Sequence, residues 1–132
     1  MIKAYDGTPH TVVLTANKTL LASDSGTVFH IATDGKTVTL PAIADVPIGT
    51  TFTFKNTGVD GNNIITISPN SNDYIAGTST LAGTVVDLGV VNDKDIINTK
   101  LTTIKGDSVT VTSDGTDGWI AFPINGIWAA ES

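Results

Sequence analysis

The stretch from Gly106 to Trp128, GDSVTVTSDGTDGWIAFPINGIW, constrains the fold of this chain more than any other. In its first half Val109 and Val111 alternate with serine and threonine, which is the period-2 pattern of a strand with one buried face. The segment SDGTDG predicts a tight turn, because glycine accepts positive φ and aspartate bonds its own backbone. The extended pattern resumes at Trp119. We therefore predict a β-hairpin that places Val109, Val111 and Trp119 in the core.

The composition of the 132-residue chain favours extended backbone throughout. Threonine, valine and isoleucine are abundant, and they are stiff at χ1 and prefer strands. Glutamate occurs once, arginine and glutamine are absent, and no window has the apolar spacing of an amphipathic helix. The length suits one domain. The sequence therefore predicts an all-β protein with a single antiparallel β-sandwich, jelly-roll-like, of about eight short strands.

Two further stretches predict paired strands. Residues 19–41 contain Asp34-Gly35 between two alternating runs, which indicates a second hairpin. Residues 50–68 form two runs of alternating apolar residues separated by a loop, so they predict another pair of strands. We expect this pair to supply four core residues, Phe52, Phe54, Ile65 and Ile67.

The remaining segments predict less regular structure. Residues 69–84 are rich in asparagine, serine, glycine and threonine, which indicates a long surface loop carrying Tyr74. A strand is expected at Lys100–Ile104. Residues 1–18 predict an extended N-terminal arm with one short strand, and the β-sandwich domain is expected over residues 19–132. Because chain termini are usually mobile, such an arm needs a partner to be ordered, and a neighbouring subunit could supply one.

The charge of the chain argues against two classes of partner. Its formal charge is −6 and its seven lysines are dispersed, whereas a nucleic-acid binder needs clustered cations to neutralise phosphates. No stretch approaches the roughly 20 apolar residues that span a bilayer. The N-terminal sequence MIKAYDGTPHTVV lacks the apolar run and cleavage site of a signal peptide. We therefore expect neither nucleic acid nor membrane as a partner.

No catalytic or cofactor motif is recognisable in the sequence. His10 and His30 have no second ligand at metal-binding spacing. Oxygen ligands for calcium crowd at Asp114–Gly118, but the calcium-loop pattern with its terminal glutamate is absent, and hairpin sterics explain the Asp-Gly pairs. The chain has no cysteine. We expect no enzymatic activity, no cofactor and no metal.

The aromatic residues admit two interpretations. The four phenylalanines and Trp119 are expected to be core. Tyr74, Trp119 or Trp128 could instead form a stacking platform for a sugar. Trp128 lies outside the clear alternation of the preceding strand, so its exposure is the observation that would separate the two interpretations.

The order of the motifs resembles that of a group of small all-β proteins encoded by tailed bacteriophages. Over about residues 19–128 the chain reads LLASDSGTVFHI, DGKTVTLPA, GTTFTFKNTG, ITISP and GDSVTVTSDGTDGWIAFPINGIWA. These motifs are similar to those of head decoration proteins, or cement proteins, and the same pattern occurs in domains of phage fibres. The resemblance implies no catalytic residue, because the family has none.

For this chain the resemblance implies a structural virion protein on the outer surface of the phage head. Such a protein binds the major capsid protein, often as a trimer, and stabilises contacts between major capsid subunits. The alternative is a phage fibre or surface domain that binds host glycan, and the short chain beginning at Met1 favours the first interpretation. An enzyme is the residual third class. The candidate capsid or subunit contacts are Ile2, Tyr5, His10, Val12, Tyr74 and Trp128.

Overall fold

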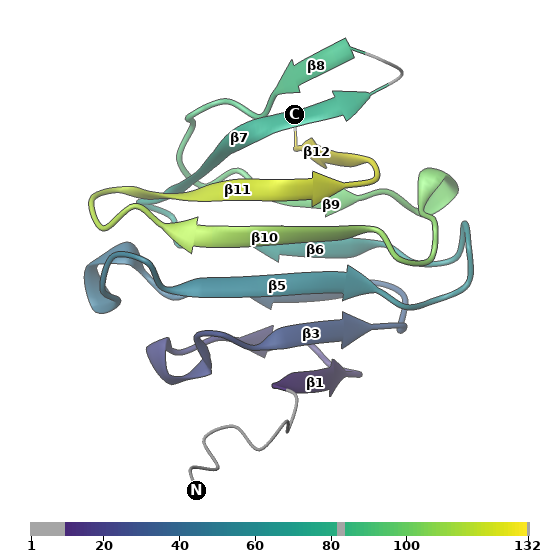
Figure 1. Cartoon of the computed structure of the whole chain (residues 1–132), viewed down its shortest axis with the longest axis horizontal. Helices are drawn as coiled ribbons and strands as arrows, with labels where there is room; N and C mark the ends of the chain where they lie inside the picture. The colour runs from purple at the N-terminus through teal and green to yellow at the C-terminus, as the bar shows by residue number, and fades with distance from the viewer. Residues whose placement is uncertain (1–9, 82–83, 132) are drawn as a thin grey trace, which may run out of the picture.

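The computed structural model describes residues 10–81 and 84–131 and arranges them in two facing β-sheets (Figure 1). The larger sheet has the strand order β1 (Thr11–Leu14), β3 (Val28–Ile31), β5 (Thr51–Asn56), β10 (Ser108–Ser113), β11 (Gly118–Asn125), β7 (Tyr74–Leu81) and β8 (Thr84–Asp87). The smaller sheet has the order β12 (Trp128–Ala130), β9 (Ile96–Asn98), β6 (Ile65–Ser68), β4 (Lys36–Thr39) and β2 (Lys18–Thr19). The described residues contain short 3-10 helices at Ala22–Asp24, Ile43–Asp45 and Lys100–Thr102 and no α-helix. The predicted all-β class is confirmed.

The first six strands alternate between the two sheets along the chain. β1, β3 and β5 pair in parallel in the larger sheet, and β2, β4 and β6 pair in parallel in the smaller one. The chain therefore winds through three stacked coils, each with one strand in either sheet. Equivalent residues of successive coils lie side by side, as Phe29 does with Phe54 and Val38 with Ile67. The wholly antiparallel pairing predicted from the sequence is wrong in this half.

The turn at Asp34-Gly35 does not form the predicted hairpin. It carries the chain from β3 in the larger sheet to β4 in the smaller one. The Gly35 N–H donates to the Ile64 carbonyl at 3.0 Å, and the Ile64 N–H donates to Asp34 Oδ1 at 2.9 Å. The turn is thus bonded to the next coil of the stack. In the same way β5 and β6 do not pair with each other, because they lie in different sheets.

The C-terminal half is mostly antiparallel. β10 pairs antiparallel with both β5 and β11, so the hairpin predicted for Gly106–Trp128 is confirmed for β10 and β11. β7 pairs in parallel with β11 and antiparallel with β8. At the β7–β11 contact a Cβ on Gly77 would lie 2.6 Å from the Ala121 carbonyl oxygen, so only glycine permits this approach. β12 then crosses to the smaller sheet and pairs with β9.

Three local predictions differ from the structure. The loop expected over residues 69–84 contains the strand β7. Its composition is polar, so the sequence did not indicate a strand, although Ile75 and Ser79 are buried. The strand expected at Lys100–Ile104 is replaced by the 3-10 helix Lys100–Thr102, and the strand lies earlier, at β9. The arm expected over residues 1–18 ends inside the sheets, because β1 and β2 are strands of the two sheets.

The core lies between the two sheets. The seven residues predicted for it, Phe52, Phe54, Ile65, Ile67, Val109, Val111 and Trp119, are all fully buried. Phe29 stacks on Phe54 with ring centroids 5.7 Å apart, and Phe52 tilts against Trp119 at 5.6 Å. These pairs contribute both buried area and favourable ring geometry.

A buried polar cluster joins the two sheets beside this core. Asn56 of β5 donates through Nδ2 to Oδ1 of Asn98 in β9 at 2.9 Å, and Asn98 Nδ2 donates to Asp107 Oδ2 at 3.1 Å. Asn63 Nδ2 donates to Asn56 Oδ1 at 3.3 Å. All four residues are buried, and buried polar groups with partners specify a unique packing.

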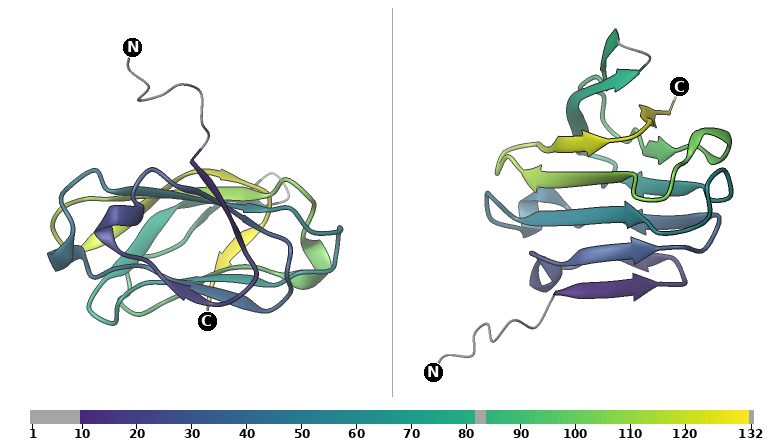
Figure 2. Two further views of the ribbon diagram at one scale, coloured as in Figure 1. Left: turned by 90° about the horizontal axis from the view of Figure 1, so that it is seen from below. Right: turned by 45° about the vertical axis from the view of Figure 1, so that its right-hand side comes forward.

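The two ends of the stacked sheets are distinct. β1 and β2 are the last strands of their sheets at one end, and β8 and β12 are the last at the other (Figure 2). β7 and β8 are tilted away from the direction of the other strands (Figure 1). None of the described helices is long and apolar enough to cross a membrane.

Candidate functional site

The outer face of β11 carries exposed apolar residues. Within β11 Trp119 and Ala121 point into the core, so the alternating residues Ile120 and Phe122 point outward. The Phe122 side chain is 75% exposed, and Ile120 is exposed as well. A ring that stays mostly in water adds little to the stability of the isolated chain, and exposed apolar patches mark interaction surfaces.

The neighbouring strands carry a different chemistry on the same outer face. Thr53 and Thr110 face each other across β5 and β10, with their hydroxyl oxygens 2.9 Å apart. Thr51 and Thr112 repeat the contact at 3.2 Å. These hydroxyls satisfy one another, so this part of the face is polar and flat. The apolar residues of β11 therefore adjoin a regular threonine surface.

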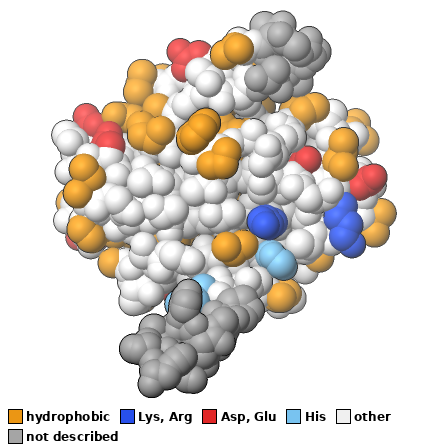
Figure 3. Space-filling model, viewed as in Figure 1, with side chains coloured by type: hydrophobic (Ala, Val, Ile, Leu, Met, Phe, Trp, Pro, Cys, Tyr) orange, Lys and Arg blue, Asp and Glu red, His pale blue; other side chains and the backbone are white. Residues whose placement is uncertain are grey.

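Further exposed apolar residues follow β8 in the chain. The connection between β8 and β9 carries Val90 and Val91, both exposed. Figure 3 shows hydrophobic side chains gathered over the upper half of this face, where β7, β8 and β11 lie, and lysine and histidine side chains over the lower half. We refer to the two exposed apolar residues of β11, Ile120 and Phe122, as the apolar face.

Two aromatic residues have exposures opposite to those expected from the sequence: Trp128 is buried and Phe122 is exposed. Trp128, a candidate contact residue, is only 1% exposed, and its Nε1–H donates to the Asn125 carbonyl at 3.2 Å. The prediction that Trp128 contacts a partner is therefore wrong, because β12 turns its ring into the core. Phe122, expected to be core, is the exposed ring. A signal for this was present, since apolar residues occupy both faces of the strand GWIAFPIN.

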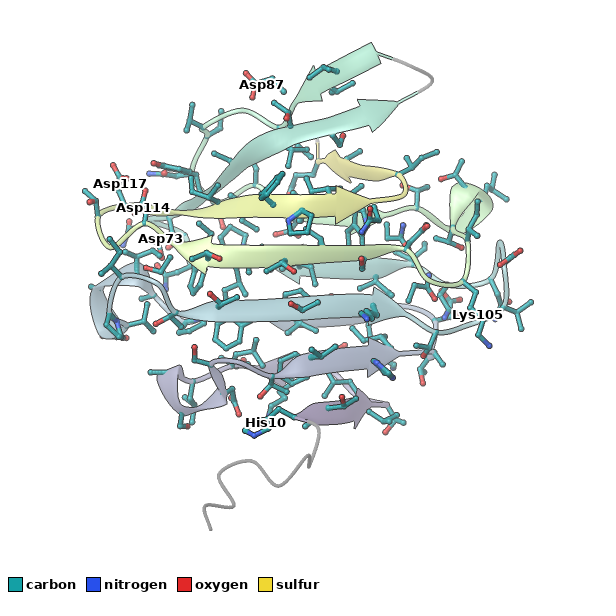
Figure 4. The ribbon with its side chains drawn as sticks, viewed as in Figure 1. His10, Asp73, Asp87, Lys105, Asp114 and Asp117 are labelled. Carbon is teal, nitrogen blue, oxygen red and sulfur yellow. The ribbon has the colours of Figure 1, made fainter. Side chains whose placement is uncertain are left out.

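Tyr74 is half-buried and held by two carboxylates. Its hydroxyl group lies 3.1 Å from Asp114 Oδ2 and 2.8 Å from Asp117 Oδ1, at the end of the molecule where Figure 4 labels both aspartates. The hydrogen bond to Asp117, burial, and the bond to Asp114 raise the pKa of Tyr74 to about 12. A Cβ on Gly118 would overlap its ring. Tyr74 therefore serves first to fix the β10–β11 loop.

Oδ1 of Asp114 is occupied within its own loop, while Oδ2 accepts the Tyr74 hydroxyl. Oδ1 accepts N–H bonds from Thr116, Asp117 and Gly118 at 2.7, 3.0 and 3.2 Å. Burial opposes ionisation of this carboxyl, and the backbone donors outweigh it, so the pKa of Asp114 is lowered. Across residues 10–81 and 84–131 no three histidine, aspartate or glutamate side chains gather as a metal would require.

Of the other predicted contact residues, the structure describes His10 and Val12, and these lie apart from the apolar face. Ile2 and Tyr5 fall outside the residues that the structure describes. His10 precedes β1 and Val12 lies within it, and both are exposed. β1 is the edge strand of the larger sheet, separated from β11 by β3, β5 and β10. The structure thus does not bring the six predicted contact residues together into one surface.

No pocket opens on the part of the surface that the structure describes. Comparison with protein families finds no family model that matches the chain. Comparison with curated proteins finds no match either.

Proposed function

We propose that this protein is a structural component of a phage virion that binds the outer surface of the capsid and stabilises contacts between major capsid subunits. The observation that carries the proposal is the exposed apolar face of β11, on which the Phe122 ring is 75% exposed. A capsid shell offers a broad, continuous protein surface. A flat face with an apolar part and a hydroxyl-bearing part is suited to such a partner.

The chemistry of the rest of the chain supports the same role. Many identical copies on an icosahedral shell gain avidity when each binds through a modest contact. A formal charge of −6 keeps the free protein soluble before assembly. The proposal includes a homo-oligomer, with a trimer favoured by the resemblance to decoration proteins, and the major capsid protein as partner.

The alternative role is a phage fibre or surface domain that binds host glycan. The burial of Trp128 and the anchored hydroxyl of Tyr74 leave Phe122 as the exposed ring on the described strands, and a single phenylalanine is a weaker sugar platform than tryptophan. These observations favour the capsid role. A broad glycan panel separates the two, since a specific signal abolished by Phe122→Ala would support the glycan role.

The test of the capsid role is addition of purified protein to undecorated heads of the phage that encodes the chain. We expect the wild-type protein to co-sediment with heads and to raise their resistance to heat. Phe122→Ala should weaken co-sedimentation by about tenfold or more, as loss of a central aromatic contact does. The matched control is Val59→Ala, since Val59 is equally exposed at 72% but lies in the loop after β5. Absence of co-sedimentation at high protein concentration would contradict the proposal.

A further inference from the structure

The two end strands of the larger sheet share an unusual pattern. β1 has the sequence TVVL and β8 has the sequence TVVD, and neither contains proline or lysine. No described strand pairs with the far side of either. Edge strands present unpaired N–H and C=O groups and are normally protected by lysine, proline or bulges. Within residues 10–81 and 84–131, the outer backbone groups of both edge strands therefore have no strand partner.

Each edge also leaves an inward-facing valine without full cover. Val12 aligns with Phe29 of β3, which is buried, so its side chain points toward the interior, yet it is 44% exposed. Val86 aligns with the buried Ser79 of β7 and is 37% exposed. The valines beside them, Val13 and Val85, point to the outer face. A further strand at either edge would cover the inward valine.

The two ends of the molecule differ in their balance of charged residues. At one end Lys18 lies on β2, and Asp24 lies in the 3-10 helix between β2 and β3. At the other end Asp87 ends β8, and Glu131 follows β12. The Asp95 N–H donates to Glu131 Oε2 at 2.8 Å, which brings two acidic residues together beside β12. Figure 4 shows His10 and Asp87 at opposite ends of the molecule. The acidic excess beside β8 and β12 disfavours a contact between two such ends and favours a contact with the Lys18 end of another copy.

We propose that copies of this chain associate head to tail, with β1 of one copy pairing beside β8 of the next so that their larger sheets become continuous. This inference rests on the homo-oligomer included in the proposed function. Pairing satisfies the open backbone groups and buries Val12 against Val86 across the junction, and it brings the Lys18 end near the Glu131 end. Because the contact joins two different surfaces, repetition closes a ring or grows a filament.

The experiment uses two variants that each disable one edge and two matched controls. Val12→Lys and Val86→Lys place an ammonium group where the junction would bury it, and we expect each to weaken self-association by about a hundredfold or more. Val13→Lys and Val85→Lys add the same charge to the same strands on the outer face, and we expect changes within about threefold. Light scattering during size-exclusion chromatography measures the mass, and thermal unfolding confirms that each variant folds.

Mixing the two disabled variants tests the direction of the contact. Val12→Lys keeps an intact β8 edge and Val86→Lys keeps an intact β1 edge, so an equimolar mixture should form a dimer that grows no further. Wild-type protein that stays monomeric at high concentration would overturn the proposal. Self-association of either disabled variant alone would also overturn it, because like edges would then be pairing, and equal loss in the controls would place the contact elsewhere. Addition to heads, measured in parallel, distinguishes failure of this contact from failure of the capsid role.

Discussion

The turn at Asp34-Gly35 and the turn after Asp114 have similar sequences, but they connect their strands differently. Both follow a strand of alternating residues and contain Asp-Gly. The first sends the chain to the facing sheet, whereas the second returns it to the same sheet as the β10–β11 hairpin. The two halves of the molecule differ in the same way, since the first six strands form parallel coils and the last strands form mainly antiparallel pairs.

The hydrogen bonds of the two turns explain the difference. Asp114 accepts three N–H bonds from its own loop, and its own N–H donates to the Gly118 carbonyl at 3.0 Å, so the loop closes on itself. Asp34 instead accepts the N–H of Ile64, which lies 30 residues further along the chain. The residues of each turn therefore determine that the chain changes direction there. Contacts distant in sequence decide which sheet the next strand joins.

The largest effect is expected from truncating the shared core. Trp119→Ala, in the hairpin half, should lower the free energy of unfolding by about 3–5 kcal/mol, and Phe29→Ala, in the coiled half, by a similar amount. Both rings contact residues of β5, so we expect one cooperative transition in urea by circular dichroism and by Trp128 fluorescence. Two separate transitions would show that the two halves unfold independently, and they would contradict a core shared between the coiled half and the hairpin half.

A smaller loss is expected at the polar cluster that joins the halves. Asn98→Ala removes partners of Asn56 and Asp107 inside the protein, and it should destabilise the fold by about 1–3 kcal/mol, because buried polar groups are left unpaired. Chemical denaturation measures this loss. The control Asn92→Ala changes an exposed residue and should stay within about 0.5 kcal/mol. Equal effects in the two variants would argue that the cluster does not join the sheets energetically.

The two turns can be compared directly by hydrogen exchange. Asp114→Ala and Asp34→Ala should each cost about 1 kcal/mol. The location of the change should differ: amides 116–118 should exchange faster in the first variant, and the Ile64 amide in the second. Faster exchange confined to the mutated turn in both variants would contradict the distinction between a self-closed and a cross-coil turn.

The hydrogen bonds of Tyr74 to Asp117 and Asp114, and the backbone donors to Asp114, predict two slopes of stability with pH. The folded pKa of Asp114 is lowered, so its contribution is complete above the unfolded value of about 3.9 and is lost as pH falls through the folded pKa. Tyr74 has its pKa raised to about 12, so its contribution is complete below the unfolded value of about 10 and is lost as pH rises through the folded one. Melting temperature against pH should show both slopes. Tyr74→Phe should flatten the alkaline one, and an unchanged alkaline slope would count against the contact.

The smallest effect on stability is expected at the apolar face. Phe122→Ala should change the free energy of unfolding by no more than about 0.5 kcal/mol, because the ring is mostly in water before and after folding. Thermal unfolding of this variant beside wild type checks the value. A loss as large as that of Trp119→Ala would mean that Phe122 packs in the core, and the apolar face would not exist.

The sequence predicted local features better than long-range ones. Alternation placed Phe52, Ile67 and Trp119 correctly, because the period-2 pattern of a strand is local. It could not assign β3 and β4 to different sheets, because that depends on a hydrogen bond across 30 residues. It misplaced Trp128 because the chain crosses to the smaller sheet after β11, and the alternation that defines inside and outside begins again there. It misplaced Phe122 for a local reason, because apolar residues occupy both faces of β11 and hydrophobicity alone does not identify the buried face.

A reconstruction of the intact virion tests the central claim most directly. The account predicts density for this protein on the outside of the head, with the outer face of β11 and the Phe122 ring toward the major capsid protein. Neighbouring copies should meet through β1 and β8 if the head-to-tail contact is retained on the shell. Density with the outer face of β11 turned to solvent, or no copy of this chain on the head, would contradict the account.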